Sequence, residues 1–244
     1  MGKEAGVYIH VPFCAGLCDY CDFYSVPVTP GDRRLDQFVD LVLADLEAEL
    51  IAQRISSVPT VYIGGGTPSV LGAVRLGRLL EGAAALLPGE CTLEANPESA
   101  EEILLRVCRD RGVNRLSLGV QSFHEPSRRA VHRAGEPALL PERLGLAAEI
   151  FGGALSLDLM TGLPYQNEYI LQKDIERVLS YEPGHLSLYS LIIEQGTPLA
   201  IAAAAGKCPL PEDDEADRLW IKGRDTLEAA GYAQYEVSNF SRPG

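Results

Sequence analysis

The sequence lacks a long apolar run, and it lacks an excess of positive charge. No apolar stretch reaches the roughly 18 residues that a membrane-spanning helix needs. The amino-terminal M-G-K-E-A-G leads directly into V-Y-I-H-V without the apolar region of a signal peptide. We therefore expect no membrane span and a cytoplasmic location. With 21 Lys and Arg against 34 Asp and Glu, the net charge of −13 disfavours binding to nucleic acid or anionic lipid.

Disorder and repeat architecture are excluded as well. The 244 residues are 46% hydrophobic and 23% charged, which is typical of a globular protein. There is neither an internal repeat nor a low-complexity linker. The length suits one or two domains, or a single α/β barrel.

Six β-rich runs alternate with segments of helical periodicity, which predicts a parallel sheet with helices outside it. The predicted strands read as near-continuous apolar runs, so we expect both faces of each strand to be buried. Periodicity alone leaves an open doubly wound sheet and a curved barrel as alternatives. The predicted strands cover residues 7–11, 60–64, 91–95, 115–119, 154–160 and 185–191. The predicted helices cover residues 35–50, 68 to about 87, 101–111, segments between 120 and 150, 171–179 and 213–230.

The carboxyl-terminal tail has a different pattern. Gly231 stops the last predicted helix, and residues 232–237 then alternate like a strand. We expect no partner element after this strand. The chain closes on S-R-P-G, which is typical of a turn rather than a domain end.

Three cysteines within eight residues form the sharpest feature of the sequence. Cys14, Cys18 and Cys21 directly follow the first predicted strand, where parallel α/β folds place their chemistry. Thiolates are soft ligands for iron–sulfur clusters or zinc. A zinc site usually takes a fourth ligand, and His10 is a candidate although it lies inside a predicted strand. Three thiolates on a four-iron cluster would leave one iron open. The remaining alternative for the three clustered cysteines is that they are simply buried or redox-active. The three cysteines elsewhere in the sequence are expected to be ordinary free thiols: Cys91, Cys108 and Cys208.

The spacing C-x3-C-x2-C, with Tyr20 before the last cysteine, resembles the signature of the radical S-adenosylmethionine (SAM) enzymes. This resemblance implies a partial (β/α)6 barrel. It also implies that the three cysteines bind a 4Fe-4S cluster whose open iron chelates the amino and carboxylate groups of SAM. In that family, a reduced cluster cleaves SAM to methionine and a 5′-deoxyadenosyl radical. Tyr20 would lie against SAM.

Further motifs resemble one branch of that superfamily, the oxygen-independent coproporphyrinogen III oxidases and the related HemW heme chaperones. They include V-Y-I-H-V-P-F-C, I-G-G-G-T-P-S, L-E-A-N-P-E, R-L-S-L-G-V-Q-S-F, L-D-L-M-T-G-L-P, I-E-Q-G-T-P-L and Y-E-V-S-N-F. The oxidases carry another cysteine two residues after the third cluster cysteine, where this chain has Phe23. C-D-F therefore resembles the heme-carrier side. A SAM-dependent decarboxylase of coproporphyrinogen propionates and a plain structural zinc or interaction domain are the alternatives.

The resemblance also implies a set of SAM contacts. The glycine-rich turn after the second strand would face the methionine part of SAM, and Glu94 would accept hydrogen bonds from SAM hydroxyls. Asp158 lies among apolar residues and needs a partner or a polar cavity; Arg133 is a candidate partner. A tight turn and a structural polar network are the alternatives to these roles. The expected SAM contacts are Tyr8, Tyr20, Gly65, Gly66, Thr67, Glu94, Gln121, Arg133 and Asp158.

Related proteins continue past the Y-E-V-S-N-F segment into a separate domain. We therefore expect residues 1–231 to form the barrel core and 232–244 to begin an extension that is cut short. The resemblance implies heme or a porphyrinogen as ligand, together with a heme-acceptor protein and an electron donor as partners. None of the four histidines stands out as a heme ligand.

Overall fold

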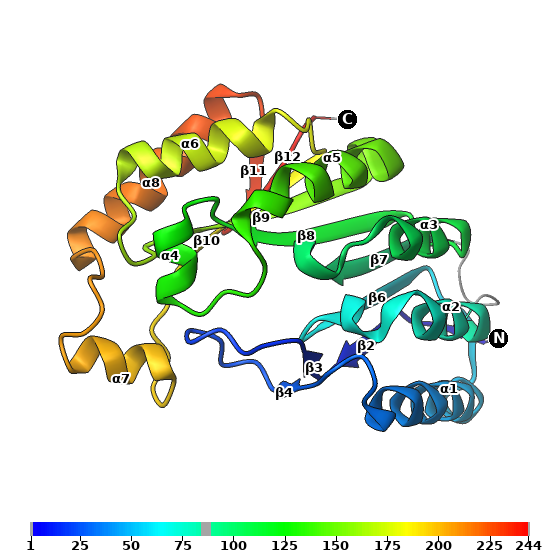
Figure 1. Cartoon of the computed structure of the whole chain (residues 1–244). Coiled ribbons are helices and arrows are strands. Elements are labelled where there is room, and N and C mark those ends of the chain that lie inside the picture. Colours follow the sequence, from blue (N-terminus) through cyan, green and yellow to red (C-terminus); the bar gives the residue numbers. More distant parts are fainter. Residues whose placement is uncertain (1, 84–88, 244) are drawn as a thin grey trace.

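The structure is a computed structural model that describes residues 2–83 and 89–243 (Figure 1). Six parallel strands follow one another across one sheet in chain order, and two antiparallel strands complete its far edge. A doubly wound sheet would instead reverse its strand order. The predicted partial (β/α)6 barrel is therefore confirmed, with β2 and β11 as the edges of an open sheet. Its strands are β2 (Val7–Val11), β6 (Thr60–Gly65), β7 (Glu90–Ala95), β8 (Arg115–Gln121), β9 (Leu155–Thr161), β10 (His185–Ser190), β11 (Ala233–Glu236) and β12 (Asn239–Ser241).

Helices lie along the outside of this curved sheet, as Figure 1 shows. Two of them begin at side-chain caps: the Asp32 carboxylate accepts from the Arg34 N–H at 2.8 Å, and the Asn167 side chain accepts from the Ile170 N–H at 3.0 Å. The outer helices are α1 (Arg33–Gln53), α2 (Gly72–Ala83), α3 (Glu102–Asp110), α5 (Leu140–Phe151), α6 (Glu168–Leu179) and α8 (Asp213–Ala229). The predicted continuation of the second helix to residue 87 lies outside the described residues.

Short helices and two-stranded pairings lie in the connections between the main strands and helices. The α4 helix (Glu125–Ala130) falls within the predicted helical segments, whereas α7 (Pro198–Ala204) was not predicted. Two small pairings flank the amino-terminal strand: β1 (Lys3–Glu4) with β5 (Ile55–Ser57), and β3 (Phe13–Cys14) with β4 (Val26–Pro27). In the described part of the chain, no helix is long and apolar enough to cross a membrane.

The two faces of the sheet differ in polarity. The face toward the helices is fully apolar, with Ile63, Leu93 and Leu157 at 0% exposure. The inner face carries polar side chains in register, since Glu94 lies opposite Ser117 and Asp158 lies opposite Ser187. The central strands β8 and β9 are largely buried on both faces, as expected, but their inner face is polar. A curved sheet has an interior, and that interior is where a polar site forms.

The tail belongs to the same sheet. β11 pairs with β12, and β12 pairs antiparallel with β10, with Phe240 fully buried opposite Leu186. The expectation of no partner element after residue 237 is therefore wrong, because the tight turn after β11 returns the chain to the sheet. All four residues of β11 are exposed.

Candidate functional site

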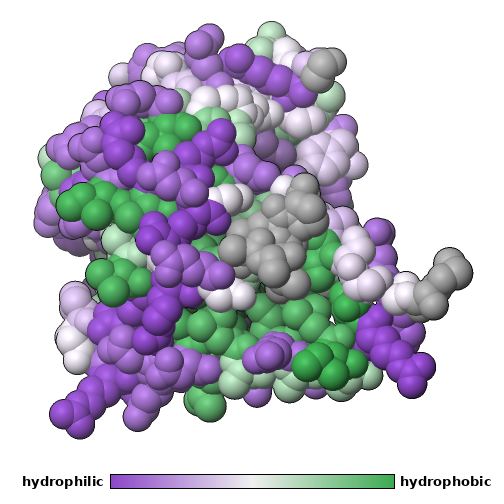
Figure 2. Space-filling model, turned by 90° about the vertical axis from the view of Figure 1, so that its right-hand side faces the viewer, coloured by the Kyte–Doolittle hydropathy of each residue, from purple (hydrophilic) through white to green (hydrophobic). Residues whose placement is uncertain are grey.

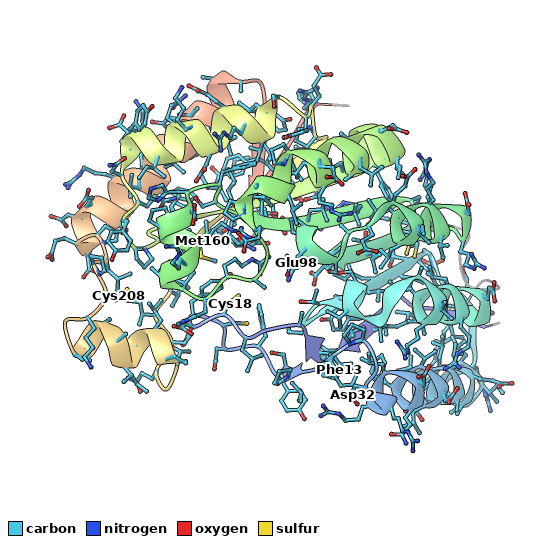
Figure 3. The ribbon with its side chains drawn as sticks, in the orientation of Figure 1. Phe13, Cys18, Asp32, Glu98, Met160 and Cys208 are labelled. Atoms are coloured by element: carbon cyan, nitrogen blue, oxygen red, sulfur yellow. The ribbon has the colours of Figure 1, made fainter. Side chains whose placement is uncertain are left out.

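The cysteine loop is closed at its base by backbone hydrogen bonds. The N–H of Val26 donates to the Pro12 carbonyl, and the N–H of Val28 donates to the Cys14 carbonyl, both at 2.9 Å. Figure 3 shows Cys18 on this loop, on the side of the molecule where Met160 lies near the end of β9. The loop therefore presents its thiols at the carboxyl ends of the parallel strands, as the sequence predicts.

Two side chains donate to the predicted cluster cysteines. The hydroxyl of Thr67 lies 3.4 Å from the Cys14 sulfur, and Nη1 of Arg133 lies 3.7 Å from the Cys18 sulfur. Thr67 precedes the 3₁₀ turn Pro68–Leu71, but its side chain makes no capping hydrogen bond. Thr67 thus stands at the N-cap position of this turn, but its hydroxyl is directed to the Cys14 sulfur. Donors of this kind stabilise thiolate ligands.

The six cysteines fall into two chemical groups. Burial raises the pKa of Cys91 to about 11 and that of Cys108 to about 12, and both thiols are fully buried in the apolar core. Thiols of this kind are inert. Within the described ranges, no three His, Cys, Asp or Glu side chains lie together as a site for a single metal ion. The structure thus offers no closed zinc site that includes His10.

The glycine-rich strap, residues 64–67, lies against the cysteine loop. The N–H of Gly66 donates to the Val11 carbonyl at 2.8 Å, and the N–H of Thr67 donates to the Phe13 carbonyl at 2.7 Å. A Cβ on Gly66 would come within 2.7 Å of the Phe13 carbonyl oxygen, and Gly65 has φ +110°. Both positions therefore require glycine, for close approach and for backbone conformation respectively.

A cavity of about 490 Å³ opens beside this strap, at the carboxyl ends of the strands. It contains eight of the nine predicted SAM contacts; Tyr8 is the exception. The residues that the sequence analysis did not single out here include Asn96, Ser117, Tyr189 and Ile192. Asn96 belongs to the L-E-A-N-P-E motif, and Ser117 shares the inward alternation of β8, so both could have been found. The cavity is lined by Tyr20, Cys21, Asp22, Phe23, Gly65, Gly66, Thr67, Pro68, Glu94, Ala95, Asn96, Ser117, Gly119, Gln121, Arg133, Asp158, Met160, Tyr189, Ser190, Ile192 and Glu194.

Glu94 is held by two donors. The Tyr62 hydroxyl donates to one carboxylate oxygen at 2.6 Å, and the N–H of Gly65 donates to the other at 3.1 Å. Each oxygen keeps acceptor capacity for a ligand hydroxyl. Tyr8 lies outside the cavity: its ring is 59% exposed, packs 6.0 Å from the Tyr62 ring, and its hydroxyl lies 3.1 Å from Nδ1 of His10.

The Arg133 guanidinium makes several hydrogen bonds to residues around the cavity. Its Nη2 donates to the Asn96 side-chain oxygen at 2.7 Å and also to the Gly119 carbonyl. Asn96 in turn donates to the Thr67 hydroxyl at 3.1 Å. Arg133 thus reaches Cys18 directly and Cys14 through a two-residue relay. Among the described residues it forms no ion pair with Asp158, so of the two alternatives for Asp158 the structure shows the polar cavity and not the Arg133 partner.

The buried Asp158 carboxylate is paired with a hydroxyl donor rather than with a cation. The Ser117 hydroxyl donates to both carboxylate oxygens, at 3.2 and 3.3 Å. Burial is the main cause that raises the pKa of Asp158 to about 6; hydrogen bonds from the Ser187 and Ser117 hydroxyls oppose this rise, and the nearby Glu94 charge adds to it. A second cavity of about 560 Å³ shares Glu94, Ser117 and Asp158 and extends along the sheet interior to Arg115 and His185. Asp158 is therefore a polar group in a polar interior, and it titrates near neutral pH.

Tyr20 completes the wall next to the thiols. Its ring lines the cavity and packs with Val131, Leu163 and Leu199. Burial raises the pKa of its hydroxyl, so Tyr20 is neutral at physiological pH. The side chain therefore offers a flat apolar face and a neutral donor to a ligand in the cavity.

The family description "Radical SAM superfamily" matches residues 8–178, more than two thirds of the chain. The chain belongs to the radical SAM superfamily. This family implies a 4Fe-4S cluster and SAM as cofactors. Among solved structures, the chain resembles Escherichia coli coproporphyrinogen III oxidase (HemN), a radical SAM enzyme, with a TM-score of 0.87 and 26% identity. That match covers 99% of this chain and 56% of the other.

Two curated relatives are similar across almost the whole chain. The heme chaperone HemW of Escherichia coli is 37% identical over 98% of this chain and 63% of its own length. A mitochondrial radical SAM domain-containing protein 1 of mouse is 36% identical over 99% of this chain and 55% of its own length. The radical SAM chain thus spans less than two thirds of the length of these relatives.

The radical SAM site fits its implied cofactors. Thr67 and Arg133 aim donors at two of the three cysteine sulfurs, which suits thiolates that share a cluster. The buried Gln121 Oε1 and Arg133 Nε have no hydrogen-bond partner among the described residues. Buried polar atoms are nearly always paired in a filled site. These two atoms are therefore suited to pairing with a polar ligand in the cavity.

Proposed function

We propose that this chain is the cluster- and SAM-binding part of a heme carrier that delivers heme to an acceptor protein. The observation that carries the proposal is Phe23, which stands where the oxidases that the chain resembles have a further cysteine. Its ring is 73% exposed and lines the cavity. A large exposed aromatic ring at a cavity mouth favours a flat apolar ligand.

Further support comes from a second exposed apolar residue. Ile192 follows β10, lines the same cavity and is 68% exposed. Phe23 and Ile192 therefore add exposed apolar surface to the cavity lining, beside the exposed carboxylates of Asp22 and Glu194. Heme has an apolar macrocycle, so this apolar surface suits it.

The deeper residues are assigned to the cofactors in this proposal. Cys14, Cys18 and Cys21 would hold the 4Fe-4S cluster, which supplies electrons for SAM cleavage when it is reduced. The sulfurs of Cys14 and Cys18 receive donors from Thr67 and Arg133, as described above. The SAM contacts would be the eight predicted residues that line the cavity, and Tyr8 lies outside it beside Tyr62.

Charge complementarity favours one orientation of SAM in the cavity. Arg133 and the unpartnered Gln121 oxygen lie toward the cysteine loop, so they suit the carboxylate and ammonium of the methionine part. Glu94 accepts from donors and suits the hydroxyls of the ribose. This orientation is the one in which the chelating groups of SAM point to the cluster.

The decarboxylase remains the second candidate because of one observation. The solved structure with a TM-score of 0.87 is that of a coproporphyrinogen III oxidase. The curated Escherichia coli relative at 37% identity is instead named a heme chaperone. Together with Phe23, that higher identity favours the carrier.

The partners and the location of the carrier are also part of the proposal. A carrier needs an acceptor protein for heme, and the cluster needs an electron donor. The cytoplasmic location predicted from the sequence belongs here too; the name of the mouse relative places that protein in mitochondria.

Anaerobic reconstitution with iron and sulfide, followed by two assays, tests the function. Heme titrated into the reconstituted chain should give a saturable Soret band. Coproporphyrinogen III with SAM and dithionite should yield 5′-deoxyadenosine without matching release of carbon dioxide. Saturable heme binding without turnover supports the carrier. Carbon dioxide release that tracks 5′-deoxyadenosine through many turnovers makes the chain a decarboxylase instead.

A pair of variants tests the heme surface. Phe23→Ala should weaken heme binding by roughly ten- to a hundredfold, since one fully covered aromatic side chain contributes roughly 1.5–3 kcal/mol. Tyr24→Ala is the matched control, because Tyr24 is 75% exposed and is not one of the cavity-lining residues. Equal effects of the two substitutions would contradict a heme surface at the cavity mouth.

A further inference from the structure

Two of the cavity residues sit on one irregular segment between β8 and α5. Gln121 is the last residue of β8, and Arg133 lies beyond the short α4 helix. Gln121 has φ +66°, a left-handed conformation that is unfavourable for a residue other than glycine. Surrounding contacts must therefore hold this segment, residues 121–135, in place.

One buried cation ties the two ends of the segment together. The Arg128 side chain is 2% exposed. Its Nη1 donates to the carbonyls of Val120 and Ser122, at 2.7 and 3.2 Å. Its Nη2 donates to the Ala134 carbonyl at 2.7 Å. The segment is thus an internally fastened loop, and it needs a further contact to fix it to the rest of the fold.

That contact comes from the outer helix α6. The Asp174 carboxylate accepts the Ser122 hydroxyl at 2.5 Å and the Phe123 N–H at 2.9 Å. Asp174 is 2% exposed and lies on the buried side of α6 with Leu171, Ile175 and Val178. Ser122 directly follows Gln121, so the Asp174 bonds act on the strained residue's neighbour. Arg177 packs over the Phe123 ring at 5.2 Å and adds a positive charge beside the same site.

We propose that Asp174 is a positioning residue: from outside the barrel it holds the 121–135 segment in the conformation that turns Gln121 and Arg133 into the SAM cavity. A carboxylate is costly in an apolar helix face unless it is paired. Here it accepts one side-chain and one backbone donor from two consecutive residues, Ser122 and Phe123. A purely apolar contact would pack the helix equally well but would not fix the direction of Gln121.

The inference rests on SAM binding in the proposed function, and it predicts a specific loss. Without Asp174 the segment occupies its binding conformation for a smaller fraction of the time, so the apparent dissociation constant for SAM rises by the inverse of that fraction. Cluster content should stay unchanged, because all three cysteine thiols are retained. The reduced cluster without SAM should also show an altered electron paramagnetic resonance (EPR) spectrum, since Arg133 lies against Cys18.

The experiment compares Asp174→Asn with Ile175→Val in the full chain, reconstituted to the same iron content. Ile175 is the neighbouring core residue on α6, at 1% exposure. Both variants lower the melting temperature. Only Asp174→Asn should weaken SAM binding, by roughly tenfold in equilibrium dialysis. Ser122→Ala should reproduce part of this effect, and the double variant should add little beyond Asp174→Asn.

The outcomes separate the inference from the proposed function. If the unmodified chain binds SAM and Asp174→Asn binds it equally well at full iron content, the positioning role is overturned. An equal loss in Ile175→Val overturns it as well, because the role would then be only structural. If the unmodified chain binds no SAM, the proposed function fails together with the inference. Should Asp174→Asn fail to fold, Ser122→Ala with unchanged SAM affinity overturns the inference by itself.

Discussion

Nη1 of Arg133 lies 3.7 Å from the Cys18 sulfur, although 115 residues separate the two in the sequence. This contact joins the cysteine loop after β3 to the segment after α4. It places the Arg133 guanidinium, a cation of the cavity lining, next to the predicted cluster ligand Cys18. The site is therefore built from the segments that follow the edge strand β2 and the central strand β8, which the curvature of the sheet brings together.

The first prediction concerns the cysteines. Alanine at Cys14, Cys18 or Cys21 should remove most of the iron bound after reconstitution, since each thiolate is a ligand. Alanine at Cys91, Cys108 or Cys208 should leave the iron content unchanged. Iron and sulfide analysis of all six variants measures this. The assignment fails if Cys91 or Cys108 proves as necessary as Cys18.

The second prediction concerns the relay from Arg133 through Asn96 to Thr67. Asn96→Ala and Thr67→Val should each make the cluster's reduction potential more negative, because donors to sulfur stabilise the reduced state, which carries more negative charge. A lost hydrogen bond of about 1 kcal/mol corresponds to roughly 40 mV for one electron. EPR-monitored potentiometry measures the shift.

Thr67→Ser is the matched control for the relay, since it keeps the hydroxyl that lies 3.4 Å from Cys14. Its potential should equal that of the unmodified chain. A relay would also make the Asn96→Ala and Thr67→Val shifts less than additive. Unchanged potentials in both variants would show that Asn96 has no effect on the cluster.

The third prediction concerns pH. Burial raises the pKa of Asp158 to about 6, so the carboxylate is mainly protonated at pH 5 and mainly ionised at pH 7. A ligand that donates hydrogen bonds prefers the ionised form. SAM affinity should therefore rise between pH 5 and pH 7 and level off above that. Asp158→Asn should remove this rise. A pH profile shared by the variant and the unmodified chain would exclude Asp158 as its source.

Much of the architecture follows from the sequence because its causes are local. The six parallel strands and the cysteine loop are marked by short apolar runs, caps and spacing, and the residues concerned lie next to each other in the chain. The alternation of Glu94, Ser117 and Asp158 toward the interior was the missed signal, since each polar residue lies within an apolar strand. Reading it would have favoured the curved sheet over a flat one.

The partners of individual side chains could not be predicted in this way. Arg133 is a candidate partner of Asp158 from the sequence, whereas in the structure it binds Asn96, the Gly119 carbonyl and Cys18. That choice depends on how far the sheet curves and where the segment after α4 returns, which are properties of the whole fold. The antiparallel return of β12 was missed for a related reason: three residues carry too little pattern to mark a strand.

The central claim is that three cysteines hold a cluster with an iron site open to SAM in the cavity beside Arg133. The most direct test is the EPR spectrum of the dithionite-reduced, fully reconstituted chain, recorded with and without SAM. Because three thiolates leave one iron without a protein ligand, saturating SAM should change the spectrum. An unchanged spectrum at saturating SAM and full iron content would contradict the account.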